Sequence, residues 1–121
     1  MLKKVFFRYA GKKLFVLAVK SGAFRKVLGL MFKKRTARAL LFVFKRPTRI
    51  AIHSLFVFFP FIAVWLDRKG KVIDIKKVEP FTLHVKTKKP FTMLIEIPMN
   101  KRYSRLIKVL IPKKYYSPTR D

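Results

Sequence analysis

A run of seventeen residues without Lys, Arg, Asp or Glu, Ile50 to Leu66, lies in the middle of a chain whose formal net charge is +25. A helix over this run would be about 26 Å long, which is short of the roughly 30 Å hydrocarbon core of a bilayer. Pro60 would interrupt such a helix, and the run is rich in the Ile, Val and Phe that favour strands. We therefore predict two adjacent strands, Ile50–Phe58 and Ile62–Leu66, that are buried on both faces, with a membrane span as the alternative.

The length and composition favour one folded domain. The chain has 121 residues, of which 51% are hydrophobic and 13 are Phe, enough to fill a single core. It contains no Cys, which excludes disulfides, thiol chemistry and Cys-ligated metals. We predict a single domain over residues 1–121, with a core from about residue 5 to 111 and a loosely held tail at 112–121.

Short apolar runs with a period of two predict a mostly β fold. Besides the two strands above, the expected strands are Val5–Tyr9, Leu14–Val19, Leu40–Phe44, Val72–Val78, Phe81–Val85 and Met93–Ile97. Residues 10–13 predict a hairpin turn and residues 67–70 a second turn. Val109–Ile111 is a candidate to close the sheet, whereas Ser104–Lys108 fits neither pattern clearly.

One segment has the period of a helix. Ala23–Met31 places Phe24, Val27, Leu28 and Met31 on one face of a short helix. Many short strands with a single short helix are typical of a closed β structure. We therefore predict a mostly β (α+β) fold, a small single-domain antiparallel β-barrel-like structure.

Five segments stand in a recognisable order along the chain. They are Gly29–Phe32, Leu40–Phe44, His53–Pro60, Trp65–Asp67 with Gly70 and Val72-Ile73, and Leu94–Pro98. Over roughly Leu14 to Val109 they resemble the uncharacterised family called domain of unknown function 192. The resemblance implies a small, barrel-like β fold with a short helix, found in bacteria and archaea, with no established activity. The chain has Ile62 where the family usually carries an Asp, and Asn100 near the position of a family Gly.

The charge balance points to anionic partners. The chain has thirty basic residues and five acidic ones, so most cations lack a partner and repel one another. The basic clusters lie in predicted turns, where a charged cluster is usually a solvated surface. The candidate anion-contacting residues are Lys33, Lys34, Arg35, Arg38, Lys86, Lys88 and Lys89. They would contact phosphates with little sequence choice, so we predict a non-enzymatic module that binds polyanions such as a nucleic acid backbone.

Two alternatives remain for the function. An exposed edge at Phe56 and Phe58, together with the cations, would suit an anionic membrane surface. A barrel with a pocket around His53 and Trp65 would instead bind a small ligand.

Enzyme motifs are absent from the sequence. His53 and His84 are too few for a zinc site, which needs three or four ligands. Neither a Gly-x-Ser-x-Gly motif nor a phosphate-binding glycine loop occurs. Asp67 is expected to shape a turn and Glu96 to pair with a surplus Lys. We predict no catalytic residue, metal or cofactor.

The remaining expectations concern the source and location. Gln is absent, Asn occurs once and Lys is abundant, which predicts a thermophilic source. The family resemblance implies an archaeal-type member. The apolar run at Phe15–Val19 is too short for a signal peptide. We expect a cytoplasmic protein, with membrane association as the alternative.

Overall fold

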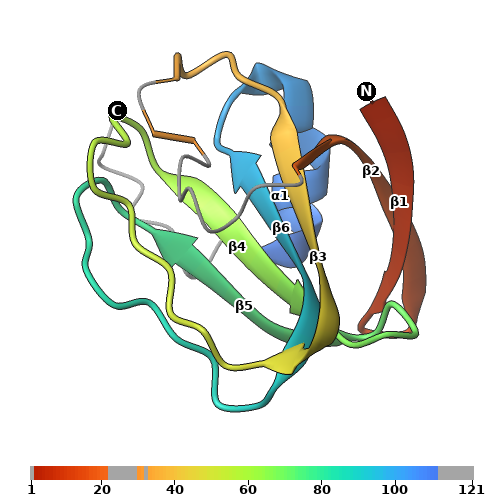
Figure 1. Cartoon of the computed structure of the whole chain (residues 1–121). Coiled ribbons are helices and arrows are strands. Elements are labelled where there is room, and N and C mark those ends of the chain that lie inside the picture. Colours follow the sequence, from red (N-terminus) through yellow and green to blue (C-terminus); the bar gives the residue numbers. More distant parts are fainter. Residues whose placement is uncertain (1, 22–29, 32, 112–121) are drawn as a thin grey trace.

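A computed structural model of the chain describes residues 2–21, 30–31 and 33–111 (Figure 1). Within them, six strands form one sheet in the order β1-β2-β3-β6-β4-β5. The elements are β1 Leu2–Tyr9, β2 Lys12–Ser21, β3 Ala39–Thr48, β4 Phe61–Leu66, β5 Val72–Val78, β6 Phe91–Pro98, the 3₁₀ helix η2 Lys101–Tyr103 and the helix α1 Ser104–Leu110. Neighbouring strands are antiparallel except for β2 and β3, which are parallel.

The predicted N-terminal hairpin is confirmed. Tyr9 pairs with Lys12, so two residues connect β1 to β2. Those residues, Ala10 and Gly11, have φ angles of 53° and 76°. A two-residue turn with positive φ at both positions matches the right-handed twist of its flanking strands. The turn therefore fixes the register of the whole hairpin.

The sheet curls into a half-barrel because its two edge strands, β1 and β5, approach one another at one point. The backbone N–H of Arg8 donates to the carbonyl of Gly70 at 2.9 Å, beside a bridge between Arg8 and Lys71. Gly70 has a φ of +84°, and a Cβ at this position would lie 3.2 Å from the carbonyl oxygen of Phe6. Glycine is required here because the turn needs positive φ and the two backbones approach closely.

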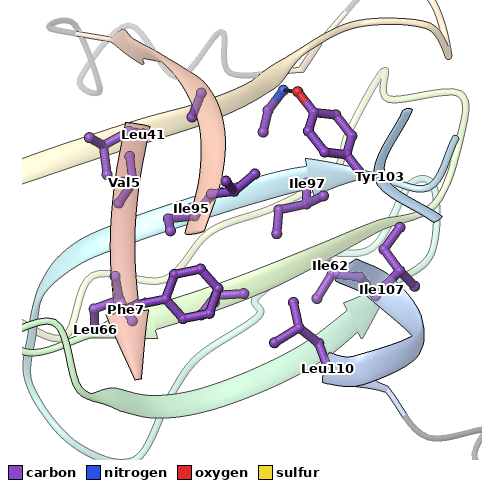
Figure 2. Packing of buried hydrophobic residues seen from close by; sticks show 14 residues of the cluster. Val5, Phe7, Leu41, Ile62, Leu66, Ile95, Ile97, Tyr103, Ile107 and Leu110 are labelled. Atoms are coloured by element: carbon purple, nitrogen blue, oxygen red, sulfur yellow. Dashed lines mark hydrogen bonds between the residues drawn. The ribbon is translucent and has the colours of Figure 1, made fainter. Parts of the chain in front are cut away.

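The concave face of the sheet is filled by what we call the inner layer (Figure 2). It consists of Val5, Phe7, Val16, Ala18, Ala39, Leu41, Ile62, Val64, Leu66, Ile95, Ile97, Tyr103, Ile107 and Leu110. Alternate residues of the strands contribute to it, as the period of two requires. The helix α1 adds Ile107 and Leu110, which lie three residues apart on one helical face.

The opposite face of the central strands carries a second core, the outer layer. Its buried members are Leu30, Leu40, Phe42, Ile52, Val57, Phe59, Phe61, Ala63, Trp65, Val78, Val85, Phe91 and Leu94. Two loops, residues 49–60 and 79–90, supply much of this layer. All six residues of β4 are buried, which confirms the prediction of a strand covered on both faces.

Two predicted strands are wrong. Residues 50–58 and 81–85 are loops joined by a single bridge, Ile52 to Val85. Phe56, Phe81 and His84 have φ angles of 60°, 58° and 54°, which no strand residue adopts. Residues 50–58 resemble a strand in sequence because they lie on the sheet and bury Ile52 and Val57, whereas Phe81 and Leu83 of the second loop are exposed. In the structure, Ile50–Leu66 is a loop followed by a strand, so the helix on which the membrane-span alternative depends does not form there.

The C-terminal part of the fold also differs from the expectation. Ser104–Leu110 is a helix and Ile111 is its C-cap, so Val109–Ile111 does not close the sheet. The predicted helix Ala23–Met31 lies outside the described residues, apart from a turn at Leu30 and Met31. The predicted tail, residues 112–121, lies outside them as well. None of the described helices has the length and apolar character needed to cross a bilayer.

The mostly β fold with a short helix and a barrel-like curl is confirmed. A correction of detail is that the sheet is a half-barrel with one parallel pair of strands.

Candidate functional site

The position of η2 and α1 is fixed by the hydroxyl of Tyr103. Strands β2 and β3 pair over four positions only, from Ala18 with Ala39 to Ser21 with Phe42. Where they diverge, the Tyr103 hydroxyl accepts from the N–H of Ala39 at 2.7 Å (Figure 2). The same hydroxyl donates to the carbonyl of Leu17 at 3.1 Å. The buried hydroxyl thus forms hydrogen bonds with backbone groups of β2 and β3 that the pairing of the two strands leaves without a partner.

Three hydrogen bonds hold the loop before β3 against the start of η2. The Nδ2 of Asn100 donates to the carbonyls of Arg35 at 2.7 Å and Ala37 at 3.1 Å. Arg102 donates to the carbonyl of Thr36 at 3.4 Å. These contacts join segments about 65 positions apart in the sequence and bring their cationic side chains onto one surface.

Two open hollows lie on this surface. The larger, about 730 Å³, lies between the loop at Arg35-Thr36 and α1, and includes the apolar side chains of Met99 and Ile107. The smaller, about 320 Å³, lies at the divergence of β2 and β3, and both hollows include Arg102. The cations lining them, which we call the basic face, are Arg35, Arg38, Lys101, Arg102, Arg105 and Lys108.

The basic face has no carboxylate to neutralise it. No acidic residue is among the described residues that line the two hollows. The described part of the chain forms two ion pairs, Lys76 with Asp74 at 4.0 Å and Lys77 with Glu79 at 3.2 Å. Both belong to β5 and the residue after it, away from the basic face. Adjacent like charges repel one another, which favours the binding of a counter-anion.

The seven anion-contacting residues predicted from sequence do not form one surface. Arg35 and Arg38 line the hollows, and Lys33 and Lys34 are exposed just before them in the same loop. Lys86, Lys88 and Lys89 lie before the start of β6, whereas the basic face lies beyond its end. An eight-residue strand separates its ends by about 25 Å, so these lysines belong to another region.

Four of the six cations were not among the residues predicted from the sequence. Lys101, Arg102, Arg105 and Lys108 belong to η2 and α1, a segment without a clear sequence prediction. A signal was present, because Lys101, Arg105 and Lys108 are spaced by four and three residues. This is the spacing of one helical face, and it would have indicated a cationic helix surface opposite the buried residues.

The predicted pocket residues have other surroundings. Trp65 is completely buried, with the ring of Phe91 at 6.4 Å and the Nζ of Lys76 5.9 Å above its own ring. Its indole N–H finds no acceptor among the described residues. His53 accepts at Nδ1 from the N–H of Leu55 at 3.1 Å, which shapes its own loop. Neither residue lines the hollows of the basic face.

Glu96 is not the ion-pair partner that the sequence suggested. It lies in β6 between Leu40 and Ala63 of the flanking strands and is 5% exposed. No Lys or Arg of the described residues forms an ion pair with it. Burial raises the pKa of the Glu96 carboxyl from 4.5 to about 8, because desolvation disfavours the charged form. The described residues contain no group of three or more His, Cys, Asp or Glu side chains placed to hold a metal ion.

Asp67 has the predicted role in a turn. Its Oδ1 accepts from the N–H groups of Lys69 at 2.8 Å and Lys71 at 2.9 Å. Its carbonyl accepts from the N–H of Gly70 at 3.1 Å. The carboxylate therefore organises the turn between β4 and β5.

A second distinctive surface lies on the two outer loops. We call Phe56, Phe58, Phe81 and Leu83 the aromatic patch, since all four side chains are exposed. The ring of Phe81 lies 6.1 Å from that of Phe56 and 5.3 Å from that of Phe58.

The buried Ser54 hydroxyl holds the two loops of the aromatic patch together. It donates to the carbonyl of Glu79 at 2.6 Å and accepts from the N–H of Thr82 at 2.6 Å. The backbone of Ser54 also accepts from the N–H of Phe81 at 2.9 Å.

The fold and these surfaces define a small β domain with a curled sheet, a cationic face and no recognisable catalytic centre within the described residues. The chain belongs to the domain of unknown function 192 family, described as uncharacterized, whose sequence profile matches residues 6–109. The resemblance noted from the sequence is thereby confirmed.

One curated protein is similar to part of the chain. Over 63 residues the chain is 33% identical to the UPF0127 protein PH1112 of Pyrococcus horikoshii. This match covers 50% of the chain and 54% of the relative, so the chain spans about half the length of that curated relative.

Two solved structures share the fold. One is a protein of unknown function from Novosphingobium aromaticivorans, with a TM-score of 0.67, 15% identity, and coverage of 87% of this chain and 78% of that chain. The other, from Sinorhizobium meliloti, is named as a candidate transcription regulator, with a TM-score of 0.68, 15% identity, and coverage of 87% and 84%. At this identity the likeness shows the fold alone.

Proposed function

We propose that the chain is a non-enzymatic module that binds polyanions, with a nucleic acid backbone as the ligand of the basic face. The observation that carries the proposal is the convergence of six cations from two distant segments around hollows whose described lining contains no acid. The formal net charge of +25 adds long-range attraction for any polyanion. Such a ligand is available in the cytoplasm, which is the location we propose.

The chemistry of the basic face suits phosphate. Four of its six cations are Arg, whose planar guanidinium donates two parallel hydrogen bonds to a phosphate. Lys101 and Lys108 add point charges at the rim of the larger hollow. Contacts of this kind fix a backbone without reading base edges, so binding is expected to depend weakly on sequence.

The proposal is tested by gel-shift titration of a nucleic acid at increasing salt. Each neutralised phosphate releases counterions, so the affinity should fall steeply between roughly 50 and 200 mM salt. Binding that is unchanged over this range would contradict the proposal.

A matched pair of variants locates the binding surface. One variant combines Lys101→Gln, Arg105→Gln and Lys108→Gln, side chains with no hydrogen bond among the described contacts. The other combines Lys86→Gln, Lys88→Gln and Lys89→Gln, which removes the same charge beyond the other end of β6. We expect a loss of affinity on the order of tenfold or more and a shallower salt slope in the first variant. An equal loss in both variants would show that the lysines before β6 contribute as predicted from sequence.

The aromatic patch favours a second candidate function, attachment to an anionic membrane surface. Exposed Phe side chains on loops, on a strongly cationic protein, combine the two attractions that such a surface offers. Co-sedimentation with neutral and anionic vesicles tests this candidate. Equal binding to both kinds of vesicle would exclude it.

A further inference from the structure

The outer face of the N-terminal hairpin carries a pair of exposed aromatic rings. In β1 and β2, Val5, Phe7 and Val16 face the inner layer, so the alternate residues face outward. Phe6 and Phe15 lie directly opposite one another in the register and are 53% and 52% exposed. Their ring centroids are 6.0 Å apart, with an angle of 54° between the planes. Two regular strands therefore hold two rings side by side at the surface.

Lysines surround this ring pair. The Nζ of Lys4 lies 4.9 Å from the centroid of Phe15 and 6.0 Å from that of Phe6. The Nζ of Lys13 lies 5.5 Å from the centroid of Phe6. Arg8 stands opposite Lys13 in the register, on the same outward face. The two apolar rings are thus surrounded by cationic side chains. This arrangement suits a ligand that has both an aromatic and an anionic part.

The ring pair is continuous with the basic face. The smaller hollow is lined by Phe15 together with Arg38, Arg102 and Arg105. Leu17, which also lines it, stands opposite Lys4 in the hairpin register. A chain of phosphates lying across the basic face would therefore reach the rings without leaving positively charged surface.

We propose that the ligand of this surface is single-stranded nucleic acid, with unpaired bases stacked on Phe6 and Phe15 and the phosphates on the basic face. This inference rests on the proposed function and names its ligand class. In a duplex the bases stack on one another and their faces are not available to a protein ring. In a single strand each base has a free face, and stacking on an aromatic side chain tolerates any base.

The geometry favours this ligand over a lipid surface. Phe6 and Phe15 are fixed in paired strands rather than on protruding loops, and lysine amines lie over both rings. The aromatic patch, which contains Phe58 and Phe81, is instead on the outer loops, and these loops, residues 49–60 and 79–90, run on the side of the molecule opposite the hairpin in Figure 1.

The test measures the affinity of three fluorescent oligonucleotides of about 12 residues by anisotropy at roughly 50 mM salt. They are a single strand, the same single strand with abasic sites, and a duplex. The variant Phe6→Leu with Phe15→Leu removes both rings. The control Phe58→Leu with Phe81→Leu removes an exposed ring pair from the aromatic patch.

We expect the protein to bind the single strand more tightly than the abasic strand, on the order of tenfold or more. The Phe6/Phe15 variant should lose this preference and keep its affinity for the abasic strand and the duplex. Those retained affinities also show that the basic face is still folded, and the Phe58/Phe81 control should behave as the unaltered protein.

Equal affinity for all three oligonucleotides, unchanged in the Phe6/Phe15 variant, would overturn the stacking inference and leave the proposed function in place. No binding of any oligonucleotide would contradict the proposed function itself.

A last experiment measures binding to vesicles of phosphatidylcholine with phosphatidylserine. If the Phe6/Phe15 variant loses vesicle binding and keeps its preference for the single strand, the rings contact lipid and the inference is wrong.

Discussion

The inner and outer layers share the central strands β3, β6 and β4, but they are built in different ways. The inner layer is closed by regular elements, namely the hairpin β1–β2, the strand β5 and the helix α1. The outer layer is closed by loops 49–60 and 79–90, whose backbones meet through the Ile52–Val85 bridge and the contacts of Ser54. Similar apolar composition thus gives one layer held by repeating hydrogen bonds and another that depends on a few individual contacts.

The outer layer also contains backbone strain and a buried acid. Of the four non-glycine residues with positive φ in the described chain, Phe56, Phe81 and His84 lie in its loops. Positive φ is a genuine outlier for a bulky side chain. Glu96 faces the same side of the sheet as Leu94 of the outer layer. We therefore expect the inner layer to determine global stability and the outer layer to respond to local and pH changes.

The largest effect is expected in the inner layer. Phe7 is buried against both strands and helix residues, so Phe7→Ala should lower the free energy of unfolding by about 3–5 kcal/mol. The comparison variant Phe58→Ala, at a ring that is 59% exposed, should change it by less than about 0.5 kcal/mol. Urea unfolding measures both values. Similar losses in the two variants would contradict the assignment of the core.

The next effect concerns Glu96 and pH. Its pKa is raised to about 8 in the folded protein, so the folded state retains a proton that the unfolded state loses above pH 4.5. The contribution of Glu96 to stability should therefore be fully present below pH 4.5 and be lost as the pH rises towards 8, by a few kcal/mol. Glu96→Gln should remove this part of the slope and be more stable than the unaltered protein at pH 8. Parallel pH profiles of the two proteins would show that the carboxyl is not held neutral.

A smaller and more local effect is expected at Ser54. Ser54→Ala removes the buried hydroxyl and leaves the part-buried N–H of Thr82 without its acceptor. The cost should be about 1–3 kcal/mol. Amide hydrogen exchange should accelerate in residues 50–60 and 79–85 more than in the inner strands, because the hydrogen bonds of the Ser54 hydroxyl join those loops. Uniform acceleration over the whole sheet would mean that the two layers unfold as one unit.

The smallest effect concerns the closure of the half-barrel at Gly70. Gly70→Ala adds a Cβ 3.2 Å from the carbonyl of Phe6 at a φ of +84°. Gly11→Ala is a matched control, because Gly11 has a φ of +76° and a Cβ there would meet nothing within 4 Å. We expect a loss of about 1 kcal/mol in Gly11→Ala and about 2 kcal/mol in Gly70→Ala by thermal or urea unfolding. Equal losses would show that the close approach is relieved by a small shift.

The regular elements of the sheet were predictable from the sequence, and the loops were not. The hairpin, β4 and the strand Met93–Ile97 follow from alternation and from turn residues, which are local signals. The segments 50–58 and 81–85 have the apolar composition of strands, although of their apolar side chains they bury only Ile52, Val57 and Val85 against the sheet. Their conformation depends on contacts with each other, such as those of Ser54, and these involve residues more than twenty positions apart.

The candidate site was predictable in part for a related reason. Arg35 and Arg38 were identified as members of a basic cluster, whereas Arg105 was not, because α1 has no strong helix signal of its own. The contacts that bring these residues together, such as that of Asn100 with the backbone of Arg35, follow from the tertiary fold. Charge counting identifies cations but does not show which of them become neighbours.

The central place of β6 in the sheet has a consequence for synthesis and folding. β6 is the last of the described strands along the chain, yet it pairs with β3 on one side and β4 on the other. A nascent chain that has emerged only as far as β5 can form two separate pieces, β1–β2–β3 and β4–β5, with a vacant position between them. Insertion of β6 must join them through pairs of residues far apart in sequence, so folding should be slow and be completed late in translation.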